Sequence, residues 1–310
     1  MLIVKNLPAL ALVFCVLNNY SNAQDYWQQE VNYKIDVRLD DQKHELFAEE
    51  TIEYINNSPD ELTEIYMHLW PNAYKDNSTA LAKQKLENGS TKLYYAEEED
   101  RGFIDRLDFK VNGQTVKWDY DPQHIDICKI ILNEPLKSGE RLTISTPFHV
   151  KIPKGIFSRL GHIGESYQVT QWYPKPAVYD AHGWNQMPYL DMGEFYSEFG
   201  SFDVSITLPK NYVVGATGDL VDGEAELKWL EEKVKVTEEH FKTSGSTDSE
   251  DKQDRVAVRL GSRKEDIDNI SFPPSDPEMK TLRFKQNNVH DFAWFADKRW
   301  HVLKGEVELP

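Results

Sequence analysis

Cysteine is scarce in this sequence of 310 residues. Only two cysteines are present, and Cys15 lies in an N-terminal segment that we expect to be removed. The single cysteine that remains can form no internal disulfide and no cysteine-based zinc site. Cys128 lies in the apolar run 125–132, which indicates a small buried side chain rather than a reactive nucleophile.

Positive charge is also in short supply. The chain has 35 Lys and Arg residues against 52 Asp and Glu residues, which gives a formal net charge of −17. Nucleic-acid binding depends on neutralising phosphates with basic side chains, so we expect no nucleic-acid partner. The acidic excess favours solubility and is compatible with a local site for a cationic group such as a peptide amine.

Long hydrophobic runs are missing as well. No stretch approaches the roughly 20 apolar residues that a membrane-spanning helix needs, so we expect no membrane span. The apolar run 7–17 follows an early lysine and is followed by the small residues Ser21 and Ala23. This pattern predicts that residues 1–23 are a signal peptide, that the mature chain begins at Gln24, and that the protein is exported to the periplasm or secreted. A buried N-terminal helix is the alternative.

Two familiar hydrolase motifs are absent. A His-Glu-x-x-His helix would place two imidazoles on one zinc ion, with the glutamate as base. The only His-Glu pair, at His44 and Glu45, has Ala48 where the second ligand would stand. Ser166 lacks the flanking glycines of a serine nucleophile elbow. We therefore predict no catalytic residue, no metal ligand and no bound cofactor within this chain.

The residues that are present predict a globular, mainly β protein. Hydrophobic residues make up 40% and aromatic residues 12% of the chain, which is too much for a disordered chain. Apolar and polar residues alternate with the two-residue period of half-buried strands. Such runs occur at 33–39, 46–55, 62–69, 104–111, 125–132, 141–150, 202–208, 211–216, 225–230, 234–241, 255–260 and 280–286.

Local signals refine this prediction. Asn112 and Gly113 stand between two strand-like runs and predict a two-residue hairpin turn, because both residues tolerate positive φ. The only convincing helix is short, at about 78–87, before Asn88 and Gly89. We predict an all-β fold of antiparallel sheets, with few helices and with residues 24–310 forming one domain.

The segment 161–184 is unusually dense in aromatic residues, amides and prolines. Prolines fix the local backbone, while Glu165, Gln168 and Gln171 offer hydrogen-bond acceptors beside aromatic walls, as a ligand surface would. Aromatic residues also dominate protein cores. A packing corner is therefore the competing interpretation of this segment.

The same segment carries a family resemblance, together with other motifs along the chain. The chain resembles the N-terminal part of secreted bacterial zinc metallopeptidases of the aminopeptidase N family, which are gluzincins. The resemblance runs from about residue 30 to the end of the sequence and rests on the order of several individually weak motifs. These lie at 65–74, 171–180, 195–204, 208–209, 213–218 and 290–294.

The resemblance implies a saddle-shaped N-terminal β domain, followed in the family by a thermolysin-like domain that holds zinc through His-Glu-x-x-His. It implies that this chain stops before that catalytic domain, which would be its partner, and is inactive alone. Zinc and a peptide substrate then belong to the full-length protein. In the family, an acidic or amide residue of the N-terminal domain binds the free amine of the substrate. The loose local match assigns this role to Glu165 or to Gln168.

Our leading hypothesis is therefore the cleft-forming N-terminal domain of an exported zinc aminopeptidase. The alternative is a self-contained secreted β-sandwich that binds a glycan or a protein. If a catalytic domain is missing, an apolar face should be exposed. We expect that face around Tyr167 and Gln168, Trp172 and Tyr173, Trp184 and the segment 292–300.

Overall fold

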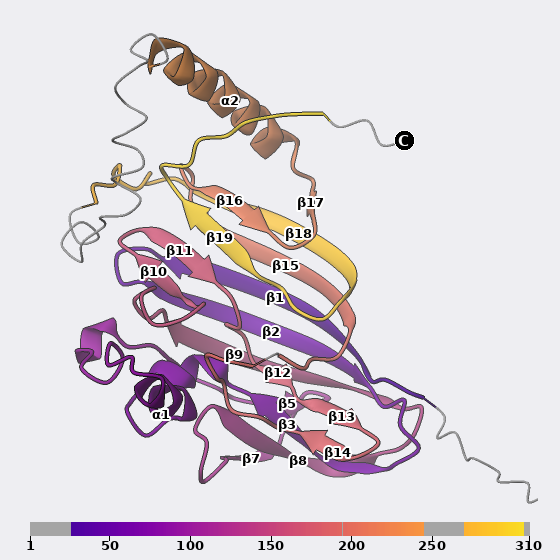
Figure 1. Ribbon diagram of the computed structural model, residues 1–310. Coiled ribbons are helices and arrows are strands. Elements are labelled where there is room, and N and C mark those ends of the chain that lie inside the picture. The colour runs from indigo at the N-terminus through magenta and orange to yellow at the C-terminus, as the bar shows by residue number, and fades with distance from the viewer. Residues whose placement is uncertain (1–25, 194, 245–269, 307–310) are drawn as a thin grey trace, which may run out of the picture.

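The computed structural model describes residues 26–193, 195–244 and 270–306. The predicted signal peptide and the predicted strand at 255–260 lie outside these residues. Most of the described chain is β-strand, as the alternating sequence pattern predicts, and the all-β fold class is confirmed. Figure 1 shows one long twisted sheet crossed by smaller sheets, with the second α-helix at one end of the molecule.

The main sheet has nine strands. Its order is β17-β18-β15-β1-β2-β9-β5-β6, and β4 pairs with β9 beside that path. All its pairs are antiparallel except β1 and β15, which run parallel from Tyr33 opposite Phe202 to Arg38 opposite Thr207. The strands are β1 (Glu30–Asp40), β2 (Glu45–Ile55), β4 (Phe103–Asp105), β5 (Lys110–Val111), β6 (Gln114–Thr115), β9 (Arg141–Lys151), β15 (Gly200–Pro209), β17 (Asp219–Val221) and β18 (Met279–Val289).

Three smaller sheets make up the rest of the β structure in the described residues. One has the order β12-β3-β8-β7, with β3 (Leu62–His68), β7 (Lys117–Tyr120), β8 (Ile127–Leu136) and β12 (Lys175–Pro176). The second has the order β10-β11-β19-β16, with β10 (Gly161–Ile163), β11 (Ser166–Val169), β16 (Val213–Ala216) and β19 (Trp294–Asp297). The third is the hairpin of β13 (Val178–Asp180) and β14 (Gly183–Asn185).

One hydrophobic core joins the sheets. Every second residue of β1 is buried, from Val31 to Leu39, because successive side chains of a strand point to opposite faces. The largest fully buried side chains include Trp70, Trp172 and Trp294, which come from segments far apart in the sequence. Cys128 is also fully buried, and burial raises the pKa of its thiol. The prediction that Cys128 is a small buried side chain is confirmed.

The short helix predicted at 78–87 is present as α1 (Ala80–Glu87). Thr79 caps it, because its hydroxyl accepts a hydrogen bond from the Ala82 amide at 3.2 Å. Gly89 follows the helix with a φ of 79°, a conformation that favours glycine. The hairpin turn at Asn112 and Gly113 is also confirmed, with φ values of 50° and 77° between β5 and β6. The described part of the chain also contains two 3-10 helices, η1 (Trp70–Tyr74) and η2 (Glu98–Asp100).

The strands predicted at 225–230 and 234–241 are wrong. These residues form one long helix, α2 (Glu224–Ser244). Glutamate, lysine and leucine are strong helix formers, and their summed preference outweighs the short alternation around 234–236. The first turn carries Glu224 and Glu226 and the last carries Lys242, which is the charge order that the helix dipole favours.

Helix α2 contacts the end of the described chain. The backbone N–H of Val302 donates to the Thr237 hydroxyl at 3.1 Å, and the rings of His240 and His301 stack with centroids 5.2 Å apart. Lys280 of β18 anchors the helix to the main sheet through Glu226 at 2.7 Å. Within the described residues, no helix is long and apolar enough to cross a bilayer.

Candidate functional site

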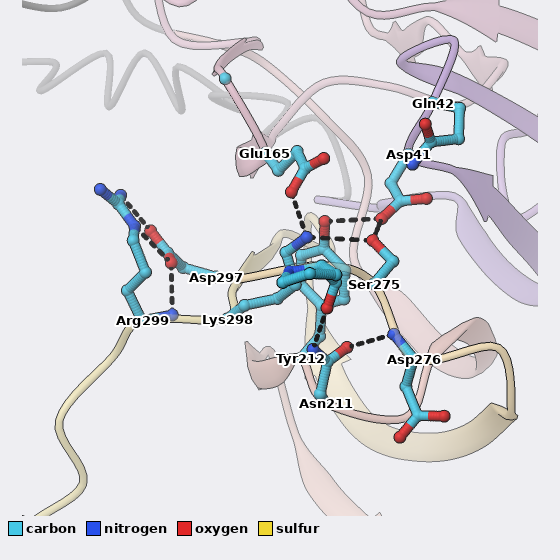
Figure 2. Close-up of polar contacts among 12 residues, drawn as sticks. Asp41, Gln42, Glu165, Asn211, Tyr212, Ser275, Asp276, Asp297, Lys298 and Arg299 are labelled. Atoms are coloured by element: carbon cyan, nitrogen blue, oxygen red, sulfur yellow. Dashed lines mark hydrogen bonds and ion pairs between the residues drawn. The ribbon is translucent and has the colours of Figure 1, made fainter. Parts of the chain in front are cut away.

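Glu165 lies in the turn between β10 and β11. Its carboxylate accepts a hydrogen bond from the ammonium group of Lys298, which directly follows β19 (Figure 2). The Lys298 side chain is completely buried, whereas that of Glu165 is 26% exposed. Glu165 therefore supplies a compensating charge for a buried cation, which is costly to leave unpaired.

A small hydrogen-bonded network surrounds the Lys298 ammonium group (Figure 2). Lys298 also donates to the Ser275 hydroxyl at 3.0 Å and lies over the Tyr212 ring at 5.3 Å. The Asp41 carboxylate accepts from the Ser275 hydroxyl and from the Tyr212 hydroxyl, the latter at 3.0 Å. A substrate amine that bound to Glu165 would share its carboxylate with the ammonium group of Lys298, which contacts one of the two oxygens.

Gln168 is exposed on β11, where it stands opposite Gly161 of β10 and Phe295 of β19. The structure describes no contact between Gln168 and Glu165. Tyr167 between them is fully buried, and its hydroxyl bonds to the backbone carbonyl of Asp41 at 3.2 Å. The structure thus places the two predicted amine-binding residues on one hairpin but does not join them in one site, and their role stays a prediction.

A second polar centre is buried beneath the aromatic segment. Lys175 is 1% exposed, donates to the Gln171 side-chain oxygen at 2.6 Å and lies 3.5 Å from the Asp291 carboxylate. Tyr173 donates its hydroxyl to the same carboxylate at 2.7 Å. The Lys175 ammonium group also lies 4.4 Å from the centre of the Trp70 ring. This geometry provides the charge partner and cation–π contact that a buried lysine requires.

Burial sets the protonation behaviour of this centre. Burial lowers the pKa of Lys175, and Asp291 opposes that shift. Burial and the neighbouring Asp291 carboxylate raise the pKa of Tyr173 well above its ordinary value. Tyr173 therefore keeps its proton at neutral pH and stays a hydrogen-bond donor to Asp291.

Further carboxyl groups of the described residues are buried outside ion pairs, among them Glu50 and Glu198. Glu50 on β2 is 2% exposed, neither of its oxygens has a hydrogen-bond partner, and burial raises its pKa well above the ordinary value. Glu198 is 4% exposed and accepts one hydrogen bond, from the Tyr179 amide at 3.3 Å. Burial, aided by Asp180, raises the pKa of Glu198 to about 7.

The described residues do not fit a zinc site. Across 26–193, 195–244 and 270–306, no group of three or more His, Cys, Asp or Glu residues could hold a metal ion. The ring centroids of His44 and His162 are 3.7 Å apart in a stacked arrangement. Burial and the neighbouring His44 lower the pKa of His162 to about 3, which keeps its imidazole neutral. His162 also bonds to the Gly164 carbonyl. This pair is a packing contact, and no metal chemistry is assigned to it.

The predicted exposed face is largely wrong. Tyr167, Trp172, Tyr173 and Trp294 are all at most 2% exposed, because they fill the space between the sheets. These buried side chains fit the competing interpretation, in which the aromatic residues form a packing corner. Trp184 is half-buried, while Trp300 is 38% exposed.

Sequence reasoning missed the partners of the buried charges. Lys298 lies 133 positions from Glu165, and Asp291 lies 120 positions from Gln171, so no local spacing connects them. For Asp291 one signal was available, because it belongs to the motif at 290–294. Glu198 likewise belongs to the motif at 195–204, but nothing in that motif marks its carboxyl group as buried.

Comparisons with known proteins give similar structures only. No family model and no curated protein matches the sequence. An M1 zinc metallopeptidase from Deinococcus radiodurans matches with 13% sequence identity and a TM-score of 0.42, covering 87% of this chain and 42% of that chain. A two-domain M1 zinc metallopeptidase bound to L-arginine matches with 12% identity and a TM-score of 0.41, with the same coverage. This chain thus spans less than half the length of the solved structures it matches.

Proposed function

We propose that this chain is the cleft-forming, β-rich N-terminal domain of an exported zinc metallo-aminopeptidase. In that arrangement a partner catalytic domain of the same protein supplies the zinc-activated water that cleaves the peptide bond. The present residues wall the substrate cleft and hydrolyse nothing alone.

The main support for this proposal is that residues from several of the family-like motifs lie together in the structure. Lys175 and Tyr173 come from the motif at 171–180, Asp291 from the motif at 290–294, and Trp70 from the motif at 65–74. They meet around one buried ammonium group. Phe202, from the motif at 195–204, packs against the Tyr173 ring with centroids 5.8 Å apart. Motifs that are weak one by one therefore specify a single buried structure, which is what a shared fold requires.

The first test is the gene itself. The reading frame should continue beyond codon 310 and encode His-Glu-x-x-His within about a hundred codons, since two imidazoles one helical turn apart are needed for the metal. The longer protein should contain one zinc per molecule and release amino acids from unblocked peptides, whereas an N-acetylated peptide should resist.

The matched control is the present chain. It should contain far less than one zinc per molecule, and a chelator should leave its melting temperature unchanged, because no metal is linked to its folding. A reading frame that stops without a zinc motif would overturn the proposal. So would peptide hydrolysis by the present chain alone.

A further inference from the structure

A pocket of about 250 Å³ lies between the residues that lead into β1 and the β13–β14 hairpin. Its lining includes Trp27, Tyr179 and Tyr196, together with Asp180 and Glu198. Both flanking segments lie at the same end of the molecule in Figure 1. Glu165 and Gln168 do not line this pocket.

Aromatic rings form much of its wall. The rings of Trp27 and Tyr179 stack with centroids 5.8 Å apart and an interplanar angle of 28°. Tyr179 is fixed by its hydroxyl, which donates to Asp60 at 2.8 Å, and by a ring contact with Trp184 at 5.0 Å. Tyr196 is 44% exposed and donates to the Asp180 carboxylate at 3.4 Å. Ring faces of this kind attract cations through their quadrupole.

The fixed charges around the pocket have one sign. Asp180 and Glu198 line it, and no lysine or arginine does among the described residues. The nearby Asp180 and Glu198 carboxyl groups, after burial, raise the pKa of Tyr196. His182 is the one lining side chain that can carry a positive charge, and it is exposed. Glu198 is buried with no cationic partner described, so an arriving cation would gain an unopposed carboxylate.

We propose that this pocket binds an organic ammonium group, with its methyl or methylene surface against Trp27, Tyr179 and Tyr196 and its charge facing Asp180 and Glu198. The pocket is too acidic for an anion. Aromatic walls favour a weakly hydrated organic cation over a metal ion, which prefers several oxygen ligands. The proposal stands on these contacts and does not depend on the peptidase function.

A polar groove continues from the pocket and suits the remainder of such a ligand. The groove shares Gln28 with the pocket and is lined by Asn32, Asn57, Asn288 and Glu53, among others. Its volume is about 710 Å³. Amide side chains both donate and accept hydrogen bonds, so the groove can hold polar groups attached to the ammonium carbon.

The test is a titration of the purified chain at constant ionic strength and above about pH 8, where Glu198 with its pKa of about 7 is ionised. Binding is followed by Trp fluorescence and by NMR of the ligand. Tetramethylammonium and ethylammonium chlorides are the probes, tert-butanol is the neutral analogue of similar size, and sodium chloride is the salt control. Both ammonium ions should bind saturably, at least about tenfold more tightly than tert-butanol, since cation–π and charge contacts together exceed the energy of a tenfold difference. The ion that binds more tightly shows whether the pocket prefers a quaternary or a primary ammonium group.

Two variants localise the binding. Glu198→Gln removes the buried charge at constant shape and should weaken ammonium binding about tenfold or more. Its matched control is Glu50→Gln, which changes another buried carboxyl outside the pocket and should leave binding within about twofold of the unchanged chain. Tyr196→Leu should weaken binding severalfold by removing one ring. Its control is Tyr120→Leu, at a tyrosine of equal exposure, 44%, on β7.

Three results would overturn the proposal. The first is the absence of saturable binding by either ammonium ion. The second is equal binding of tert-butanol, or of a neutral methyl glycoside that competes at the same site, which would indicate an apolar or glycan pocket. The third is unchanged ammonium affinity in both Glu198→Gln and Tyr196→Leu. Failure of this test leaves the peptidase proposal intact, because that proposal depends on the zinc motif downstream.

Discussion

Single buried ionisable side chains carry much of the specific chemistry of this molecule. Lys175 and Lys298 are each compensated by a carboxylate from a distant segment. Glu50 and Glu198 instead stay in the interior with raised pKa values. A protein interior tolerates the first arrangement because the charges are paired, and the second because the carboxyl can take up a proton.

Glu198 should make stability depend on pH. Its pKa is raised from 4.5 to about 7, so between these values the folded chain keeps a proton that the unfolded chain has released. The free energy of unfolding therefore falls as pH rises through this window. Relative to the unchanged chain, Glu198→Gln should gain stability from pH 4.5 to pH 7, on the order of 3 kcal/mol at most. Urea unfolding at a series of pH values measures the difference. A difference that stays constant over this range would contradict the assignment.

The Lys175 centre predicts a large cost for removing one partner. Asp291→Asn leaves the buried ammonium group without its charge partner and should destabilise the chain by about 3–5 kcal/mol. The control is Glu278→Gln, which removes the partner of exposed Lys210 and should cost less than about 1 kcal/mol. Chemical denaturation compares the two variants. If both variants lost the same free energy of unfolding, burial would not explain the contribution of the ion pair at Asp291.

At the scale of elements, the junction of β1 and β15 is the most tightly constrained. A Cβ atom on Gly200 would lie 1.7 Å from the Val31 carbonyl oxygen, because the two backbones approach closely where the parallel pairing begins. Gly200→Ala must push the strands apart and should cost about 1–3 kcal/mol or more. Gly215→Ala on β16 is the matched control, since nothing lies within 4 Å of its added carbon. Similar thermal unfolding of both variants would rule out the close approach.

The sequence predicts the strands of this fold well and its longest helix badly. Residues of β1 and β2 alternate cleanly, because one face of each strand is buried and the period of two is visible in the sequence alone. Helix α2 keeps Leu227, Val236 and Phe241 more than half exposed. Its apolar residues therefore follow no single buried stripe, and the pattern that normally identifies a helix is weak.

Residues of the candidate sites could likewise be predicted only where the sequence carries a local signal. Glu165 could be singled out from the sequence because it lies beside conspicuous aromatic residues, but its partner Lys298 could not, since the pairing arises only when β11 and β19 come together. The pocket around Glu198 could not be predicted from the sequence either, because its lining residues are far apart along the chain. It is built from residues 26–28, which precede β1, and from the β13–β14 hairpin about 150 residues later.

At the scale of the whole molecule, the predicted export determines which residue is the first of the mature protein. The small residues Ser21 and Ala23 after an apolar run predict cleavage before Gln24. Mass spectrometry of the protein recovered from its own host should find Gln24 as the first residue. Retention of Met1 would defeat the prediction and return the chain to a reducing compartment, where a single cysteine is unremarkable.

The parallel pairing of β1 with β15 also has a consequence for synthesis. Strand β2 can pair with β1 soon after it emerges, and β9 can then pair with β2, but the other edge of β1 has no partner until the chain has been made through Pro209. Closing so long a loop is slow, and a strand edge left open in the meantime invites pairing with other chains. The nascent protein therefore passes through a period of exposure to aggregation, and a chaperone that shields β1 during that period should raise the yield of folded chain.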